Sequence, residues 1–306
     1  MKQFGIILLS SLLFLVGSSS MAYEEGVHKI AKDHKVYYKY EKAEKGKPTI
    51  VLLNGLIYAI KNWDEYFDIL AKQGFGVLQI AYSTQPESLA TLEGVEPYYQ
   101  KIIATTQGPK QIGITTQDLV DEVMSVIDDL DIDKFHLLSL SYSSVVGSEL
   151  AVQQRDRIIT NIFASPAVLA SHRYNAWGKA RHAWYESVGP AGDYYYDLEL
   201  QSSMYTLVAA GGYHFDDVDF DTFFYGVFQM GRSAKYFDLK DYTDKDLPPT
   251  HLFLASREDG SLLEDQLRFW ELMKDNPARG SFTMFEGGEH ALPGVVPKAA
   301  AEMTAK

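Results

Sequence analysis

The chain of 306 residues contains no cysteine. Disulfides, lipid attachment at a cysteine and iron–sulfur clusters are therefore excluded, and no ligand spacing typical of a zinc site is present. Because no disulfide can stabilise the fold, its stability must come from the hydrophobic core. The sequence gives no reason to expect a metal or any other cofactor.

Basic residues are scarce. Lys and Arg number 28 against 41 Asp and Glu, which gives a formal net charge of −13, and no basic run stands out. Such a chain repels polyanions, so neither nucleic acid nor an anionic membrane surface is expected as a partner. An apolar content of 46% is typical of a globular protein. The composition does not indicate an oligomeric state.

Long apolar runs are absent except near the start. Lys2 precedes an apolar run over residues 4–16, and small residues follow as far as Ala22. This pattern predicts a secretory signal peptide over residues 1–22, cleaved after Ala22, and export to the periplasm or the medium. The run is too short to span a bilayer comfortably, so no stable membrane insertion is expected after cleavage. A retained anchor is the alternative.

The rest of the chain alternates between apolar strand patterns and helix patterns. Residues 49–53 form a continuous run of β-branched and leucine side chains, which is typical of a parallel strand buried on both faces. Further strands are predicted at residues 35–40, 76–82, 135–138, 158–164, 250–255 and 281–285. This order predicts an α/β fold with a mostly parallel central sheet flanked by helices.

Two stretches interrupt the alternation. Residues 83–114 are irregular and rich in Pro and Gly, which is typical of a functional or mobile loop. Residues 168–246 carry many aromatic side chains without clean alternation, and we expect a mainly helical cap insertion there. The predicted organisation is a signal peptide (1–22), the first part of a core domain (23–167), the cap (168–246) and the second part of the core (247–306).

A serine-rich corner follows the strand at residues 135–138. Small residues lead from the strand into a helix pattern, and Ser141 lies where the chain must turn. A sharp strand-to-helix turn of this kind exposes the serine hydroxyl above the sheet as a nucleophile. The usual Gly-x-Ser-x-Gly form has serines here, Ser139 and Ser143, in place of both glycines. On its own the pattern is weak.

Two later loops supply the partners that a serine nucleophile needs. Asp259 follows the strand at 250–255, and His290 follows the last strand in a glycine-rich segment. The loops at the carboxyl ends of parallel strands leave the same edge of a sheet, where ligands bind. A histidine can accept the serine proton, and a carboxylate can orient the histidine. We prefer Asp259 for the carboxylate, with Glu258 as the alternative.

The chain thus resembles the α/β-hydrolase fold superfamily over nearly all of its mature length, including the chain order serine, acid, histidine. The resemblance implies catalysis by Ser141, Asp259 and His290, and an oxyanion hole made by the backbone N–H groups of Leu56 and Tyr142. Such donors contribute about 3 kcal/mol each to transition-state stabilisation. This sequence departs from the family pattern in the Asn54-Gly55 pair, in both elbow serines and in the segment at 82–86.

The resulting hypothesis is an exported serine hydrolase that cleaves an ester, less readily an amide, of a small to medium, partly apolar substrate. The alternative is a non-catalytic binding or signalling protein on the same fold with a vestigial triad, because fold alone does not determine function. Lyase or cofactor-free peroxidase chemistry on the same residues is a further possibility.

Overall fold

The computed structural model describes residues 23–31, 34–91, 114–168, 180, 183–185, 187–210, 218–235, 237–258 and 260–305. The predicted signal peptide at 1–22 lies outside these residues. Within the described residues, no helix combines the length and hydropathy that a membrane crossing would require.

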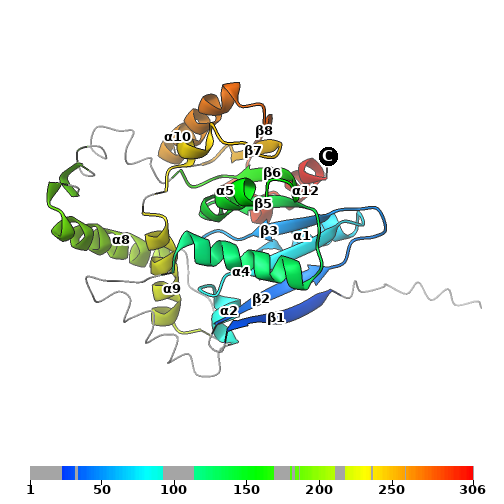
Figure 1. Cartoon of the computed structure of the whole chain (residues 1–306), viewed down its shortest axis with the longest axis horizontal. Coiled ribbons are helices and arrows are strands. Elements are labelled where there is room, and N and C mark those ends of the chain that lie inside the picture. Colours follow the sequence, from blue (N-terminus) through cyan, green and yellow to red (C-terminus); the bar gives the residue numbers. More distant parts are fainter. Residues whose placement is uncertain are drawn as a thin grey trace, which may run out of the picture.

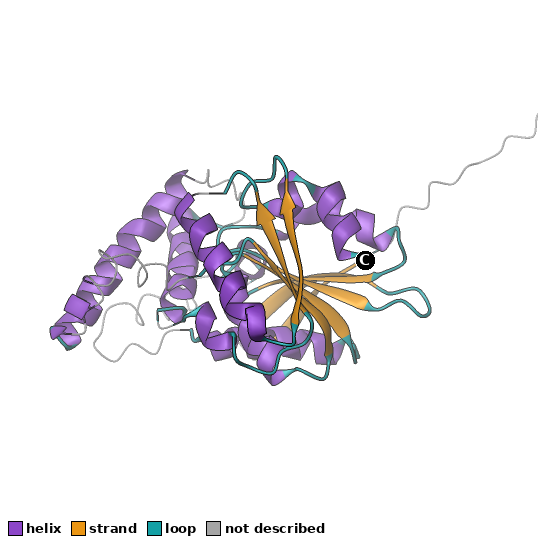
Figure 2. Ribbon diagram, turned by 90° about the horizontal axis from the view of Figure 1, so that it is seen from above, coloured by secondary structure: helices purple, strands orange, loops and turns teal. Residues whose placement is uncertain are grey.

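A single twisted sheet forms the centre of the molecule (Figures 1 and 2). Its eight strands run in the spatial order β1-β2-β4-β3-β5-β6-β7-β8. Only the pairs β1/β2 and β2/β4 are antiparallel, and all other neighbours are parallel. The predicted α/β fold with a mostly parallel sheet is therefore confirmed. The strands are β1 (Glu24–Ala31), β2 (His34–Glu41), β3 (Thr49–Leu53), β4 (Gly76–Ala81), β5 (Phe135–Leu140), β6 (Ile158–Ala164), β7 (Thr250–Ala255) and β8 (Arg279–Phe285).

Helices cover both faces of the sheet, as Figure 2 shows. The α-helices are α1 (Asp64–Ala71), α2 (Pro86–Ala90), α4 (Thr116–Asp129), α5 (Ser143–Gln153), α8 (Pro190–Ala210), α9 (Phe220–Ser233), α10 (Gly260–Leu272), α11 (Leu292–Val295) and α12 (Pro297–Thr304). The described residues also form three short 3-10 helices, η1 (Ile60–Trp63), η2 (Leu239–Tyr242) and η3 (Met273–Asp275).

The side chains of β3 show how the two layers of the core are built. Val51 and Leu53 point into a cluster with α4 and α5, whereas Ile50 and Leu52 point into a second cluster with α1 and α12. All four are fully buried. Successive strand residues face opposite sides of the sheet, so a strand covered on both faces must be apolar throughout.

The structure differs from the sequence-based expectation in two places. The strand pattern missed β1, whose residues are exposed or half-buried throughout and so carry no apolar signal. The stretch at 83–114, predicted to be irregular, contains helix α2, which begins with Pro86 at its first position. Residues 92–113 lie outside the described part of the chain. Thr115 is the N-cap residue of α4, and its side chain accepts a hydrogen bond from the Asp118 N–H.

Between β6 and β7, the described residues are mainly helical. Helices α8 and α9 pack on each other and lie beyond one end of the sheet (Figure 1). Their shared apolar cluster includes Val208, Phe223 and Val227, and it extends to Leu89 of α2 and to Leu56, three residues after β3. These helices occupy the segment predicted to form the cap, whose boundaries stay a prediction.

Helix α5 approaches β5 very closely at Gly147. A Cβ atom at Gly147 would lie 2.1 Å from Ser139 Oγ and 2.9 Å from Ser139 Cβ. Side-chain atoms cannot approach so closely, so glycine at 147 makes room for the serine at 139. The glycine usually found two residues before the nucleophile is thus replaced by a glycine on the facing helix.

This contact predicts that Ser139→Gly restores the stability that Gly147→Ala removes. Gly147→Ala should lower the free energy of unfolding by about 1–3 kcal/mol through overpacking, despite the higher helix propensity of alanine. Ser139→Gly removes both clashing atoms, so Gly147→Ala should cost far less in the Ser139→Gly background. Urea unfolding of the four proteins measures the coupling, and strictly additive effects would contradict this packing.

Candidate active site

Ser141 lies in the turn between β5 and α5 with a left-handed backbone, at φ 53°. A non-glycine residue rarely adopts this conformation, and the surroundings must hold it there. The Ser141 N–H donates to the Ala164 carbonyl at 3.0 Å, and the Ser141 carbonyl accepts from the N–H groups of Ser144 and Ala167, both at 3.0 Å. The serine at this corner is therefore fixed to β6 and to the first turn of α5.

His290 contacts both Ser141 and an acidic residue. Its Nε2 lies 2.6 Å from Ser141 Oγ, and its Nδ1 lies 2.7 Å from Glu258 Oε2. A carboxylate can only accept, so Nδ1 carries a proton toward Glu258 and Nε2 is left to accept the serine proton. The Glu258 side chain is 2% exposed. A buried carboxylate needs such a partner, and this pairing fixes the imidazole ring.

The acidic partner differs from the one preferred on the sequence. Asp259 lies outside the described residues, and the carboxylate at His290 comes from Glu258, which was the alternative. We therefore replace Asp259 by Glu258 in the candidate site. Glu258 lies three residues after Ala255, the last residue of β7, and the loop turns so that its side chain reaches His290.

The loops that carry Glu258 and His290 are joined by hydrogen bonds. Arg257 N–H donates to the Gly288 carbonyl at 3.0 Å, and Gly287 N–H donates to Ser256 Oγ at 2.9 Å. Gly287 has a φ of 73°, which favours glycine, and a Cβ at Gly288 would lie 2.7 Å from Leu292. The two glycines before His290 thus allow the loop to bend back against the loop after β7.

The two backbone donors suggested by the family resemblance lie beside Ser141. Tyr142 is the N-cap residue of α5, at the end of the helix where N–H groups lack helical partners and the dipole favours negative charge. Gly55, which precedes Leu56, packs on the serine, since a Cβ on it would lie 3.4 Å from Ser141 Cβ. Leu56 and Tyr142 both line a cavity together with Ser141 and His290.

This cavity has a volume of about 300 Å³ and lies between the sheet edge and the helices α8 and α9. Burial raises the pKa of the Tyr58 hydroxyl, and the negative charges of Glu258 and Glu289 raise it further. The lining residues are Leu56, Ile57, Tyr58, Ser141, Tyr142, Ala167, Tyr185, Tyr196, Glu199, Leu200, Ser203, Met204, Leu207, Gly231, Ala234, Lys235 and His290.

Ser143 makes hydrogen bonds that the sequence pattern did not indicate. Its Oγ donates to the Asn54 carbonyl, and Tyr82 Oη lies 2.8 Å from the same Oγ. The serine that replaces the second elbow glycine therefore links β4, the end of β3 and helix α5. Partners 61 and 89 residues away leave no local pattern that could have indicated this.

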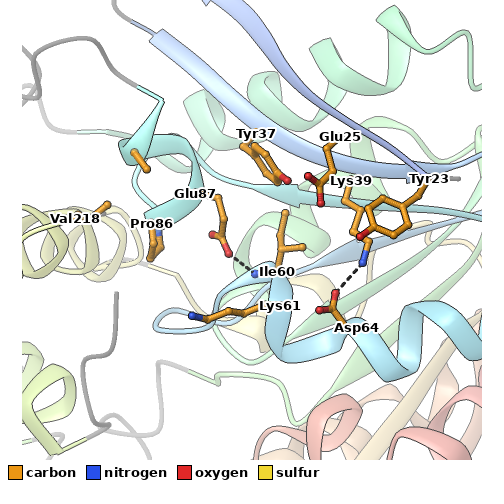
Figure 3. A pocket seen from close by; sticks show the side chains of 11 residues that line it. Tyr23, Glu25, Tyr37, Lys39, Ile60, Lys61, Asp64, Pro86, Glu87 and Val218 are labelled. Carbon is orange, nitrogen blue, oxygen red and sulfur yellow. Dashed lines mark hydrogen bonds and ion pairs between the residues drawn. The ribbon is translucent and has the colours of Figure 1, made fainter. Parts of the chain in front are cut away.

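A second cavity of about 260 Å³ lies apart from Ser141, beside the β1–β2 edge (Figure 3). Lys39 Nζ pairs there with Asp64 at 2.7 Å and lies over the Tyr23 ring at 4.2 Å. Glu87, whose pKa is raised by burial, accepts from Ile60 N–H at 2.7 Å. In neither cavity do the described residues gather His, Asp and Glu in a group that could hold a metal ion.

Neither protein-family models nor curated protein sequences give a match to this chain. Solved structures, in contrast, do align with this chain. A bromoperoxidase from Bacillus anthracis aligns at 16% identity and a TM-score of 0.59, covering 92% of this chain and 98% of its own. An enol-lactonase from Burkholderia xenovorans aligns at 17% identity and a TM-score of 0.57, covering 93% and 98%.

A carboxylesterase structure from the thaumarchaeon Nitrososphaera gargenis aligns at 15% identity and a TM-score of 0.57, covering 92% of this chain and 96% of its own. Likeness at such low identity concerns the fold. It extends over almost the whole length of each protein.

Proposed function

We propose that this chain, which has the α/β-hydrolase fold, is a serine hydrolase that cleaves a carboxylic ester through Ser141, His290 and Glu258. The observation that carries the proposal is the hydrogen-bonded chain from Ser141 Oγ through the His290 ring to Glu258, at the wall of a cavity. Enzymes of this kind place a nucleophile, a base and an orienting group within hydrogen-bond reach of one another.

In the proposed mechanism, His290 Nε2 takes the proton of Ser141 as Oγ attacks the ester carbonyl carbon. The N–H groups of Leu56 and Tyr142 stabilise the negative charge that forms on the carbonyl oxygen. Protonated His290 then gives its proton to the leaving alcohol, which leaves an acyl group on Ser141. Water, activated by His290, hydrolyses this acyl-enzyme and restores the serine.

The size and the lining of the cavity support the proposal that the substrate is small to medium and partly apolar. Leu200, Met204 and Leu207 line it from α8, and Leu56 and Ile57 line it from the core. A pocket of about 300 Å³ is at the small end of the usual range for ligand sites. We expect an ester to be preferred over an amide, whose leaving group is harder to expel.

Two substitutions at serines test the nucleophile. Ser141→Ala should lower kcat for p-nitrophenyl esters by at least about 1,000-fold, because the attacking oxygen is lost. Ser139→Ala is the matched control, since Ser139 is buried in β5, two residues before Ser141, and its Oγ has no hydrogen-bond partner in the described structure. A Ser141→Ala protein with full esterase activity would refute the mechanism.

Two neighbouring acids can be distinguished in the same assay. Glu258→Gln keeps the side-chain shape but removes the charge that orients His290, so kcat should fall by about 1,000- to 10,000-fold. Asp259→Asn should leave kcat unchanged. The reverse result, a large loss for Asp259→Asn and none for Glu258→Gln, would restore the assignment preferred from the sequence.

We also propose that the protein is exported by a signal peptide over residues 1–22, on the strength of the sequence pattern alone. Expression in a bacterial host should yield a mature protein that begins at Tyr23. Mass spectrometry of the intact protein from the exported fraction tests this, and a mass that corresponds to a start at Met1 would contradict it.

A further inference from the structure

Residues 55–58, which begin two positions after the end of β3, form a tight turn against the serine corner. Tyr58 N–H donates to the Gly55 carbonyl at 3.3 Å, which closes the turn. The turn packs on Ser141 through Gly55 and lines the cavity through Leu56 and Tyr58. It also carries Leu56, whose N–H is one of the two proposed oxyanion donors.

Gln85 holds this turn from the other side. Its side chain is fully buried, and its Nε2 donates to the Gly55 carbonyl at 2.9 Å and toward the Tyr58 carbonyl at 3.4 Å. Its Oε1 accepts from Tyr82 N–H at 3.0 Å. Only this orientation of the amide is possible, because the reverse would set Oε1 against two carbonyl oxygens.

The surroundings give Gln85 little freedom to move. Helix α9 presses on the preceding residue, since a Cβ at Gly226 would lie 2.3 Å from the Thr84 carbonyl oxygen. Helix α2 begins directly after Gln85, and its residue Glu87 accepts from Ile60 N–H at 2.7 Å (Figure 3). The chain from Gly55 to Ile60 is therefore bound to the segment around α2 at both ends.

We propose that Gln85 is a positioning residue that aims the Leu56 N–H at the oxyanion, an inference that rests on the proposed function. The Gly55 carbonyl and the Leu56 N–H belong to one peptide unit. In a trans peptide these two groups point in opposite directions, and the described chain contains no cis peptide. Gln85 Nε2 donates to the Gly55 carbonyl. The Leu56 N–H is therefore directed away from Gln85, toward the cavity that Leu56 shares with Ser141.

This role affects the transition state more than the bound substrate. An ester carbonyl carries little charge, whereas the tetrahedral intermediate carries a full negative charge that needs donors already in place. Without Gln85, the Gly55–Leu56 peptide can rotate and the donor is lost for part of the time. Substitution of Gln85 is therefore expected to lower kcat and to weaken the binding of transition-state analogues. KM should stay unchanged.

Two variants at Gln85 and one control test the proposal. Gln85→Met removes the whole amide at similar length, and Gln85→Glu keeps the acceptor for Tyr82 N–H while removing the donor. Gln79→Met is the control: Gln79 is equally buried on β4, but its Nε2 lies 3.4 Å from the Ile60 carbonyl, outside the turn. Each protein is assayed for ester kcat and KM, for inhibition by a trifluoromethyl ketone, and for Tm.

Both Gln85 variants should lose about 10- to 100-fold in kcat and bind the ketone more weakly by a similar factor, with KM unchanged. Gln79→Met should lower Tm without these effects. Folded Gln85 variants with wild-type kcat and ketone affinity would overturn the proposal, as would a loss confined to KM or one that Gln79→Met reproduces. A wild-type protein that neither hydrolyses esters nor binds the ketone would instead overturn the proposed function, and this inference with it.

Discussion

The left-handed backbone of Ser141 is the constraint on which the candidate site depends. Such a conformation costs about 1–3 kcal/mol in a residue with a side chain and persists only where its surroundings fix it. Here β6, the first turn of α5 and the Ala167 N–H all bind the Ser141 backbone. The resulting corner raises the hydroxyl above the sheet edge, where the loops after β7 and β8 bring Glu258 and His290.

The unusual serines of the corner are accommodated in two different ways. Ser139 finds space because Gly147, on the facing helix, carries no side chain. Ser143 is held by hydrogen bonds with the Asn54 carbonyl and the Tyr82 hydroxyl. The same corner is thereby tied to the turn after β3, which Gln85 holds from the opposite side. The two serines that depart from the family's glycine pattern are thus accommodated, Ser139 by packing and Ser143 by hydrogen bonds. Their presence does not by itself indicate a vestigial site.

Much of the fold could be predicted because buried parallel strands are apolar on both faces and leave a clear signal, as β3 does. Strand β1 left none, since it lies at the edge of the sheet and buries no residue fully. Ser141 and His290 could be found because each follows a run with a strand pattern and stands among small residues. Glu258 and Asp259 are adjacent, and only the path of the turn decides which one reaches His290. Gln85 and Ser143 act on backbone atoms 30 and 89 residues away, which no local pattern can indicate.

The central claim is that the hydroxyl of Ser141 is an activated nucleophile. Reaction of the full-length protein with a fluorophosphonate, followed by peptide mapping, tests this most directly, because such probes require both a working base and an oxyanion hole. We expect one phosphonyl adduct per chain, on Ser141, and no adduct on the Ser141→Ala protein. A folded wild-type protein that stays unlabelled, or that is labelled equally in the Ser141→Ala variant, would contradict the account.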